Sequence, residues 1–530
     1  MPNACGFAVR TALLLGLGVS VCLAADPGVD ALYQEFKDPP RVNTLRPFWF
    51  WNGKLDAAEV NRQIEDMVAH GVYGAYVHNR TGLETRYVSE EYFDVVKQAF
   101  AKAKQVGFHL GFVDEYEWPS GEARDVWRQG IPSRVVASNP EFGMRSLGYI
   151  ARKATGPKAV EIEGPEHVQF AAAAKLTGEE TIDPDTLRDI SASLKGSRLN
   201  WTPPDGDWLV MVYYLYPSRG LDGGTVDLMN TAAVRKFLDL VHEEYYRRFG
   251  EYYGDVLDSM YADHEGAYGY RMAWTPALFD TFRKMKGYDL RRYLPLLTHD
   301  GGKMTTKVRC DYLDVVSELY YQSFFKQVAD WAEAHKIKTS GHVWEEALHF
   351  DAAFQGDLMR VMRGFSWPGV DSLFDRGRSP RDFKAAASVA HFRGTRFTCE
   401  NQGLQGSDSY LDLQKMRLGT NAIGAWGVAT FIPHAFNYNR RRIEYPEDWF
   451  YHQPYWKYFQ HYADYTRRIS YMNADSAHVA DVLVFQPTET AWANSKPVFN
   501  ESYPYRFAFP PKWNNPLDTA NAYYGAIMTT

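Results

Sequence analysis

The chain has 530 residues, a formal net charge of -7 and a sequence pI near 6.1. This length exceeds that of an ordinary compact domain but suits a barrel with additions. Because 45% of the residues are hydrophobic and 23% are charged, the composition supports a globular core and argues against a disordered chain. The acidic balance argues against a nucleic-acid partner, since nucleic acids select basic surfaces.

Residues 1–24 have the features of a secretory signal peptide. Arg10 supplies a positive charge, residues 11–21 form a short apolar run, and Cys22-Leu23-Ala24 suits cleavage before Ala25. The run is too short to span a bilayer as a helix, and no later segment is apolar enough to do so. We therefore expect a periplasmic or extracellular protein with a cleaved signal peptide and no transmembrane segment.

Strands and helices alternate along the next part of the chain. Apolar strands are expected to start near residues 48, 72 and 108, and each ends in polar residues. Asp56 and Ser89 stand where helix N-caps belong, and Gly71 and Gly107 stand where the two helices should end. Repeated strand–helix steps of this kind predict a parallel α/β fold.

The alternation breaks between residues 131 and 227, where short β-like runs predict a β-rich insertion after the third strand. It resumes with strands expected near residues 256, 337, 370, 396 and 428, which brings the total to eight, the number that closes a (β/α)8 barrel. After the barrel, residues 481–485 resemble the first strand of a further β-containing domain. We therefore expect a TIM-type barrel in two parts (25–130 and 228–475), divided by the insertion (131–227) and followed by an incomplete C-terminal segment (476–530).

Polar residues follow the predicted strands at their carboxyl ends, which is where the active sites of such barrels lie. They include carboxylates of the kind that glycoside hydrolysis needs, together with histidines and an arginine that can partner them. Trp118 and Trp344 are candidates for stacking on a sugar ring, although core packing explains them equally well. We expect these residues to contact the substrate: His78, Arg80, Asp114, Glu115, Glu117, Trp118, Asp263, His264, His342, Trp344, Glu345, Glu346 and His434.

Glu265 and Glu400 are the strongest candidates for a catalytic pair. They follow the fourth and seventh predicted strands, on opposite sides of the barrel mouth. A single glutamate at a strand end is as often a cap or a salt-bridge partner, but two glutamates in this placement favour catalysis. The pattern indicates a glycoside hydrolase acting on an oligo- or polysaccharide.

Several motifs resemble those of glycoside hydrolase family 106, the α-L-rhamnosidases, and its relatives. The similarity runs from about residue 45 to residue 487, and the motifs are Arg46-Pro47-Phe48-Trp49-Phe50-Trp51-Asn52-Gly53, Trp118-Pro119-Ser120-Gly121, Gly341-His342 with Glu345-Glu346, Gln355-Gly356-Asp357 and Pro433-His434-Ala435-Phe436. The resemblance implies an inverting enzyme with Glu265 as acid, protonated at rest, and Glu400 as ionised base. Such a pair should lie about 6.5–9.5 Å apart. The resemblance also implies a calcium ion that touches sugar hydroxyls, and no organic cofactor.

Three alternatives stay open. The acid motif of the family is one residue longer than Asp263-His264-Glu265, so Asp263 is a rival acid, and Glu345 or Glu346 could serve as base or metal ligand. A retaining enzyme for another sugar, such as a β-galactosidase-like hydrolase, also places its acid and nucleophile after strands four and seven. A barrel that binds sugar without catalysis is the third alternative.

Overall fold

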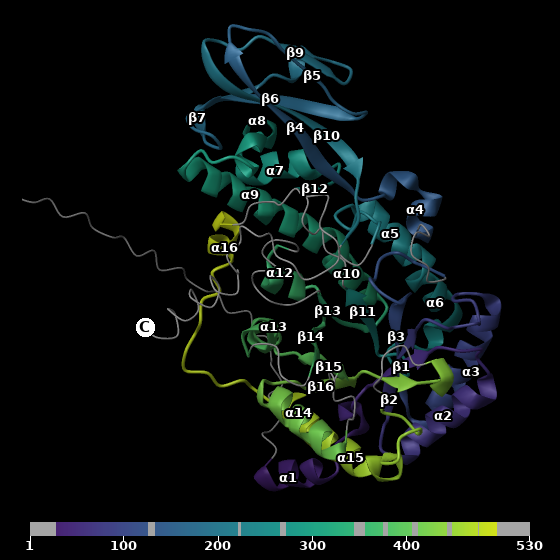
Figure 1. Cartoon of the computed structure of the whole chain (residues 1–530). Coiled ribbons are helices and arrows are strands. Elements are labelled where there is room, and N and C mark those ends of the chain that lie inside the picture. The colour runs from purple at the N-terminus through teal and green to yellow at the C-terminus, as the bar shows by residue number, and fades with distance from the viewer. Residues whose placement is uncertain are drawn as a thin grey trace, which may run out of the picture.

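The computed structural model describes residues 28–125, 133–220, 224–264, 272–343, 356–374, 380–404, 412–442, 448–474 and 476–494. The predicted signal peptide at 1–24 lies outside these residues. Within them, no helix combines the length and the apolar character that crossing a membrane requires. Figure 1 shows barrel strands surrounded by helices, with a separate group of strands projecting beyond them.

The centre of the molecule is a nearly closed barrel of parallel strands. The strand order is β16-β15-β14-β13-β11-β3-β2-β1-β17, and each adjacent pair is parallel. Because β16 and β17 are consecutive in the chain but lie at opposite ends of this order, the sheet curls until its edges meet. The predicted barrel is confirmed, with strands β1 (Phe48–Trp51), β2 (Gly74–Asn79), β3 (His109–Tyr116), β11 (Ser259–His264), β13 (Lys338–Val343), β14 (Trp367–Phe374), β15 (Thr398–Leu404), β16 (Thr430–Pro433) and β17 (Phe436–Asn437).

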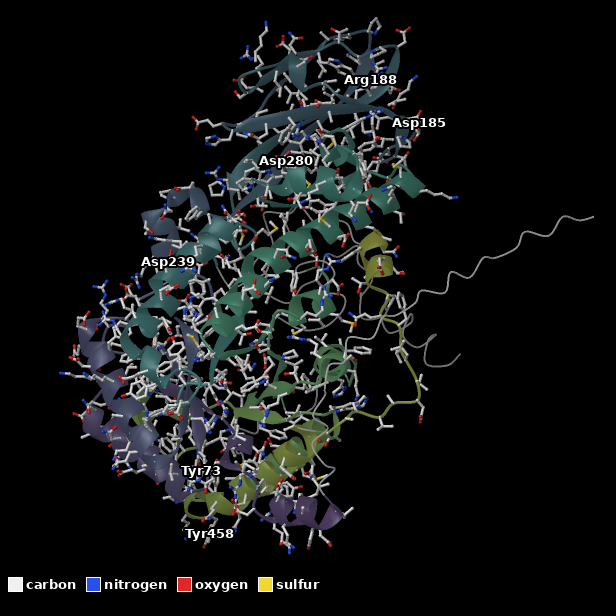
Figure 2. All side chains as sticks on the ribbon, turned by 180° about the vertical axis from the view of Figure 1, so that it is seen from behind. Tyr73, Asp185, Arg188, Asp239, Asp280 and Tyr458 are labelled. Carbon is white, nitrogen blue, oxygen red and sulfur yellow. The ribbon has the colours of Figure 1, made fainter. Side chains whose placement is uncertain are left out.

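The helices begin and end where the local chemistry places them. The Asp56 side chain accepts a hydrogen bond from the Glu59 amide, Ser89 accepts one from the Tyr92 amide, and Gly107 ends its helix in the left-handed conformation. The helices are α1 (Val29–Lys37), α2 (Ala57–Ala69), α3 (Glu90–Val106), α4 (Arg134–Ser138), α5 (Thr231–Leu240), α6 (His242–Phe249), α7 (Leu278–Lys286), α8 (Leu290–Tyr293), α9 (Lys303–Tyr320), the π-helical turn η6 (Tyr321–Lys326), α10 (Gln327–Ala334), α12 (Leu358–Met362), α13 (Pro380–Arg393), α14 (Leu413–Ala425), α15 (Phe459–Ala474) and α16 (Thr488–Asn494). Figure 2 shows charged side chains such as Asp239 of α5 and Asp280 of α7 on the outer surface.

The predicted β-rich insertion after the third strand is confirmed as two antiparallel sheets. One has the order β12-β4-β10-β6-β7 and the other β5-β9-β8. The long sheet packs one face on the main core, while Val210 and Val212 on its other face join Ile162 and Leu199 of the small sheet in a second core. The strands are β4 (Arg145–Gly156), β5 (Val160–Glu163), β6 (Val168–Leu176), β7 (Ile182–Asp189), β8 (Leu194–Lys195), β9 (Arg198–Trp201), β10 (Gly206–Pro217) and β12 (Met272–Trp274). Since β12 follows β11 in the chain, this sheet also recruits a strand from beyond residue 227; the domain boundaries themselves stay a prediction.

The C-terminal part of the described chain differs from expectation. Residues 481–485 were expected to form a strand, but in the structure they belong to no strand and are followed by helix α16, which packs on α9. A strand needs a ladder partner, and Leu483, for example, is 84% exposed. The expected strand at residues 481–485 is therefore wrong, while the further domain itself stays a prediction.

The motif at residues 46–53 closes the barrel. The buried Arg46 guanidinium donates to both carboxylate oxygens of Asp258, at 2.6 and 2.5 Å. Asn52 donates to the side-chain oxygen of Asn437 at 3.2 Å, which links β1 to β17. These contacts show that Arg46 and Asn52 of the motif stabilise the barrel itself.

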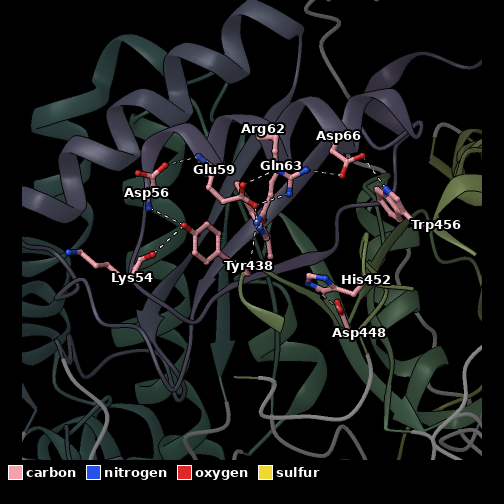
Figure 3. Close-up of polar contacts among 11 residues, drawn as sticks. Lys54, Asp56, Glu59, Arg62, Gln63, Asp66, Tyr438, Asp448, His452 and Trp456 are labelled. Atoms are coloured by element: carbon pink, nitrogen blue, oxygen red, sulfur yellow. Dashed lines mark hydrogen bonds and ion pairs between the residues drawn. The ribbon is translucent and has the colours of Figure 1, made fainter. Parts of the chain in front are cut away.

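The segment after β17 is fastened to helix α2. The Tyr438 hydroxyl accepts a hydrogen bond from the Asp56 amide at 3.0 Å, and Gln63 donates to the Tyr438 carbonyl at 3.1 Å (Figure 3). Trp456 donates to Asp66 at 3.1 Å in the same view. The chain that leaves the last barrel strand is thereby held against the first barrel helix.

Candidate active site

Three barrel strands bring Asp263, His342 and Glu400 together at their carboxyl ends. His342 Nε2 lies 3.1 Å from Asp263 Oδ1 and 3.4 Å from Glu400 Oε2. Asp263 is level with His342 in the β11–β13 pairing. All three side chains are buried, so their interactions are little screened by water.

Hydrogen-bond geometry shows that this cluster holds a proton. His342 Nδ1 lies 2.9 Å from the Val343 carbonyl oxygen, which can only accept, so Nδ1 carries a hydrogen. The opposite nitrogen, Nε2, faces two carboxyl groups. Either Nε2 is protonated as well, or one of the carboxyl groups donates to it, because a lone pair facing carboxylate oxygens would be repulsive.

The two carboxyl groups of the cluster differ in character. Burial alone would raise the pKa of Asp263, but its hydrogen bond with His342 and the charge of that ring hold this pKa below its usual value. The pKa of Glu400 is raised to about 8, mainly by burial and secondly by the charge of Asp371. Burial therefore favours the protonated form at Glu400 more than at Asp263, and the ionised state of Glu400 as base stays a prediction.

Two further histidines flank the cluster. His78 Nε2 lies 3.8 Å from Asp263 Oδ2, and His434 Nε2 lies 3.9 Å from Glu400 Oε1. Burial and the charge of Arg80 lower the pKa of His78 to about 3, and the same causes lower the pKa of His434 well below its usual value. Both rings are therefore neutral at pH 7 and add hydrogen-bonding nitrogens, not positive charge.

Arg80, Glu117 and Trp118 form a layer beside these histidines. The Arg80 guanidinium lies 4.5 Å from the Phe50 ring centre and 4.4 Å from that of Trp118. Its Nε lies 3.2 Å from Glu117 Oε2, and Glu117 Oε1 accepts a hydrogen bond from Thr81. Trp118 is half-buried with one ring face on Arg80, an arrangement that suits a stacking platform.

The side chains of Asp114, Glu115 and His264 contact other groups of the protein and do not face the cluster. Both oxygens of Glu115 are occupied by backbone amides, those of residues 116 and 124 on Oε1 and of 122 and 123 on Oε2. His264 faces the helices, where it contacts the Tyr320 hydroxyl and stacks on Phe324 with ring centres 4.6 Å apart. Their predicted contact with substrate has no support in this geometry.

Glu265, Trp344, Glu345 and Glu346 lie outside the described residues, so the Glu265–Glu400 separation stays a prediction. Asp371 was missed; it is level with Glu400 in the β14–β15 pairing and raises its pKa. Asp371 lies within its strand, where an acidic residue could have been recognised as unusual for a barrel core.

The buried cluster also has the donors of a metal site. One ligand atom from each of Asp263, His342 and Glu400 lies within 4.8 Å of the others, so the three residues could hold a metal ion. Calcium prefers six to eight oxygen ligands, whereas an imidazole nitrogen suits transition metals. As a set, the three described donors do not fit calcium.

Comparisons with known proteins connect this site to a family. A solved structure of a rhamnosidase from Novosphingobium sp. PP1Y superposes with a TM-score of 0.63 at 16% identity, covering 83% of this chain and 60% of that one, and so shares the fold. A protein of Formosa agariphila named "Putative beta-glucuronidase" is 23% identical over 525 residues, covering 87% of this chain. The chain spans 43% of that relative's length. A family profile described as α-L-rhamnosidase matches residues 159–521. The chain therefore belongs to glycoside hydrolase family 106.

Proposed function

We propose that this protein is exported and hydrolyses a glycosidic bond of a plant or microbial polysaccharide in the manner of an α-L-rhamnosidase. The observation that carries the proposal is the buried Asp263–His342–Glu400 cluster at the carboxyl ends of the barrel strands in a family 106 chain. The apolar run at residues 11–21, with a small-residue cleavage site after it, supports export.

In the proposed inverting reaction Glu400 is the base and Glu265 is the acid. Glu265 protonates the leaving oxygen, and Glu400 takes a proton from the water that attacks the far face of the sugar. Glu400 must first lose its own proton to solvent, so the reaction needs the ionised form of a group whose pKa is raised to about 8. His342 Nε2, which lies 3.4 Å from Glu400 and 3.1 Å from Asp263, positions the two carboxyl groups relative to each other.

We expect kcat/KM for an aryl glycoside with a good leaving group to rise with pH through about 8 and to level off above it. The pKa of Glu400 is raised to about 8, so the ionised form that serves as base becomes more abundant as pH rises towards that value. The measurement is a pH–rate profile under conditions where the protein stays folded. A rate that instead falls as Glu400 ionises would show that its protonated form is the active one, which would exchange the two proposed roles.

The name of the Formosa agariphila relative favours a second candidate substrate, a β-glucuronide. Nitrophenyl α-L-rhamnoside, β-glucuronide and β-galactoside should therefore be tested side by side. Proton NMR of the first-formed anomer then separates inversion from retention. Binding of these sugars without turnover of any of them would favour a sugar-binding barrel over an enzyme.

We propose a calcium ion only at a site built from residues other than Asp263, His342 and Glu400. The proposed roles of Glu265 and Glu400 need no ion at the cluster, because Asp263, His342 and Glu400 do not fit calcium as a set. Removing metals with EDTA and adding back Ca²⁺ or Mn²⁺ distinguishes a calcium site elsewhere in the protein from an ion held by the cluster. Recovery with Ca²⁺ alone would indicate a calcium site built from other residues, and recovery with Mn²⁺ alone would indicate an ion held by the cluster.

A further inference from the structure

The backbone at Asp263 is supported differently on its two sides. Towards β13, the strand is paired through its last residue, with Asp263 level with His342 and His264 level with Val343. Towards β3, the pairing consists of Met260 with Phe112 and Tyr261 with Val113. Beyond that point the Ser120 amide, in the loop after β3, donates to the Asp263 carbonyl oxygen at 2.9 Å. The loop thus takes the place of the neighbouring strand next to Asp263.

Ser120 is itself held by a buried carboxylate. Its hydroxyl donates to Asp114 Oδ1 at 2.5 Å, and His242 Nε2 of helix α6 lies 3.4 Å from Asp114 Oδ2. Asp114, Ser120 and His242 are each 1% exposed. Val113 belongs to the cluster of side chains inside the barrel, so Asp114, the next residue of β3, faces outward to the helices. Asp114 therefore faces away from the place where a sugar would bind.

We propose that Asp114 is a positioning residue, which acts through Ser120 to set the place of Asp263. This inference rests on the proposed hydrolase function of the site. The carboxylate fixes the Ser120 hydroxyl, the Ser120 amide fixes the Asp263 carbonyl, and the Asp263 side chain holds His342 against Glu400. A hydrogen bond to a charged, buried acceptor is stronger than one between neutral groups, which suits this anchoring part.

The kinetic test uses Asp114→Ala, Asp114→Asn and Ser120→Ala. Asp114→Ala is expected to lower kcat about 10- to 100-fold, the size of loss that a displacement near 1 Å can cause. KM should stay within about threefold, because no substrate contact is removed. Asp114→Asn keeps an acceptor oxygen for Ser120 and should recover most of kcat. The double variant Asp114→Ala/Ser120→Ala should be no slower than Asp114→Ala, because both changes break the same contact.

Asp227→Ala is the matched control for Asp114→Ala. Asp227 is a buried aspartate that likewise accepts a hydroxyl hydrogen bond, from Thr275 at 2.7 Å, and it lies outside the chain of contacts to Asp263. Its replacement should leave kcat close to that of the wild type. A KM increase with unchanged kcat in Asp114→Ala would overturn the proposal by indicating direct substrate contact, and so would an Asp114→Asn variant as slow as Asp114→Ala.

A readout without substrate keeps this inference separate from the proposed function. Hydrogen exchange measured by mass spectrometry should show faster exchange of the segment containing the Ser120 amide in Asp114→Ala, and unchanged exchange there in Asp227→Ala. Unchanged exchange in Asp114→Ala would refute the proposed contact chain, whether or not the protein hydrolyses a sugar. If the wild type cleaves none of the glycosides tested while this exchange pattern holds, the proposed function fails and the contact chain stands.

Discussion

Replacing Glu400 with Gln is expected to lower kcat about 10²- to 10⁴-fold, the range that a positioned acid or base contributes. Gln occupies nearly the same volume and keeps one hydrogen-bond acceptor, but it cannot take a proton from water. The neighbouring His342 cannot take over this part, since its Nδ1 hydrogen is committed to the Val343 carbonyl and its Nε2 faces Asp263. The measurement is the turnover of whichever glycoside the wild type hydrolyses.

The thermal stability of Glu400→Gln provides the control for this loss. The pKa of Glu400 is raised to about 8 in the folded protein, above its usual value of 4.5. Folding therefore favours the protonated form, whose contribution to stability is fully present below about pH 4.5 and is lost as pH rises from there through about 8. Gln mimics the protonated form, so the variant should melt at the same temperature as the wild type at pH 4 and at a higher one at pH 9. Turnover near the wild-type rate would exclude Glu400 as base or acid.

Much of the barrel could be predicted because local chemistry and tertiary structure agree there. Asp56 and Ser89 cap their helices as expected, and the apolar strands they follow are buried on both faces, so their hydrophobic runs are continuous. Where the local signals and the tertiary packing favour the same element, that element can be predicted from the sequence.

The insertion was harder to predict strand by strand. β7 contains a proline and three aspartates among its eight residues, so its composition opposes a strand assignment, and pairing with β6 overrides it. β12 joins the same sheet from a distant part of the chain, a long-range pairing that has no local signal. Residues 481–485 show the reverse case: a run with high strand propensity remains unpaired because no neighbouring strand is present in the described chain.

The candidate site was predictable in position but not in the direction of each side chain. Asp114, Glu115, Asp263 and His264 all stand at strand ends, which places them near the rim. Whether a residue faces the barrel axis or the helices depends on strand register, and whether its oxygens are free depends on loop conformation. Asp263 faces His342, whereas Asp114 and His264 face the helices and Glu115 is enclosed by its own loop.

Breaking the ion pair between the buried Arg46 and the largely buried Asp258 is expected to cost up to about 3–5 kcal/mol of stability, because the carboxylate then keeps only Ser259 and His109 as partners. Arg46→Met should show this as a lower midpoint of urea unfolding followed by tryptophan fluorescence. Burial would raise the pKa of Asp258, but Arg46 holds it well below its usual value of 3.8. The pair therefore stabilises the protein above about pH 4 and loses this contribution as pH falls further, so the difference between wild type and Arg46→Met should shrink in acid.

Arg62 provides the control, because its pair with Glu59 is exposed, at 46% and 34%, and such pairs contribute about 0–1 kcal/mol. If Arg46→Met were no more destabilising than Arg62→Met, the Arg46–Asp258 pair would not be the contact that secures the base of the barrel.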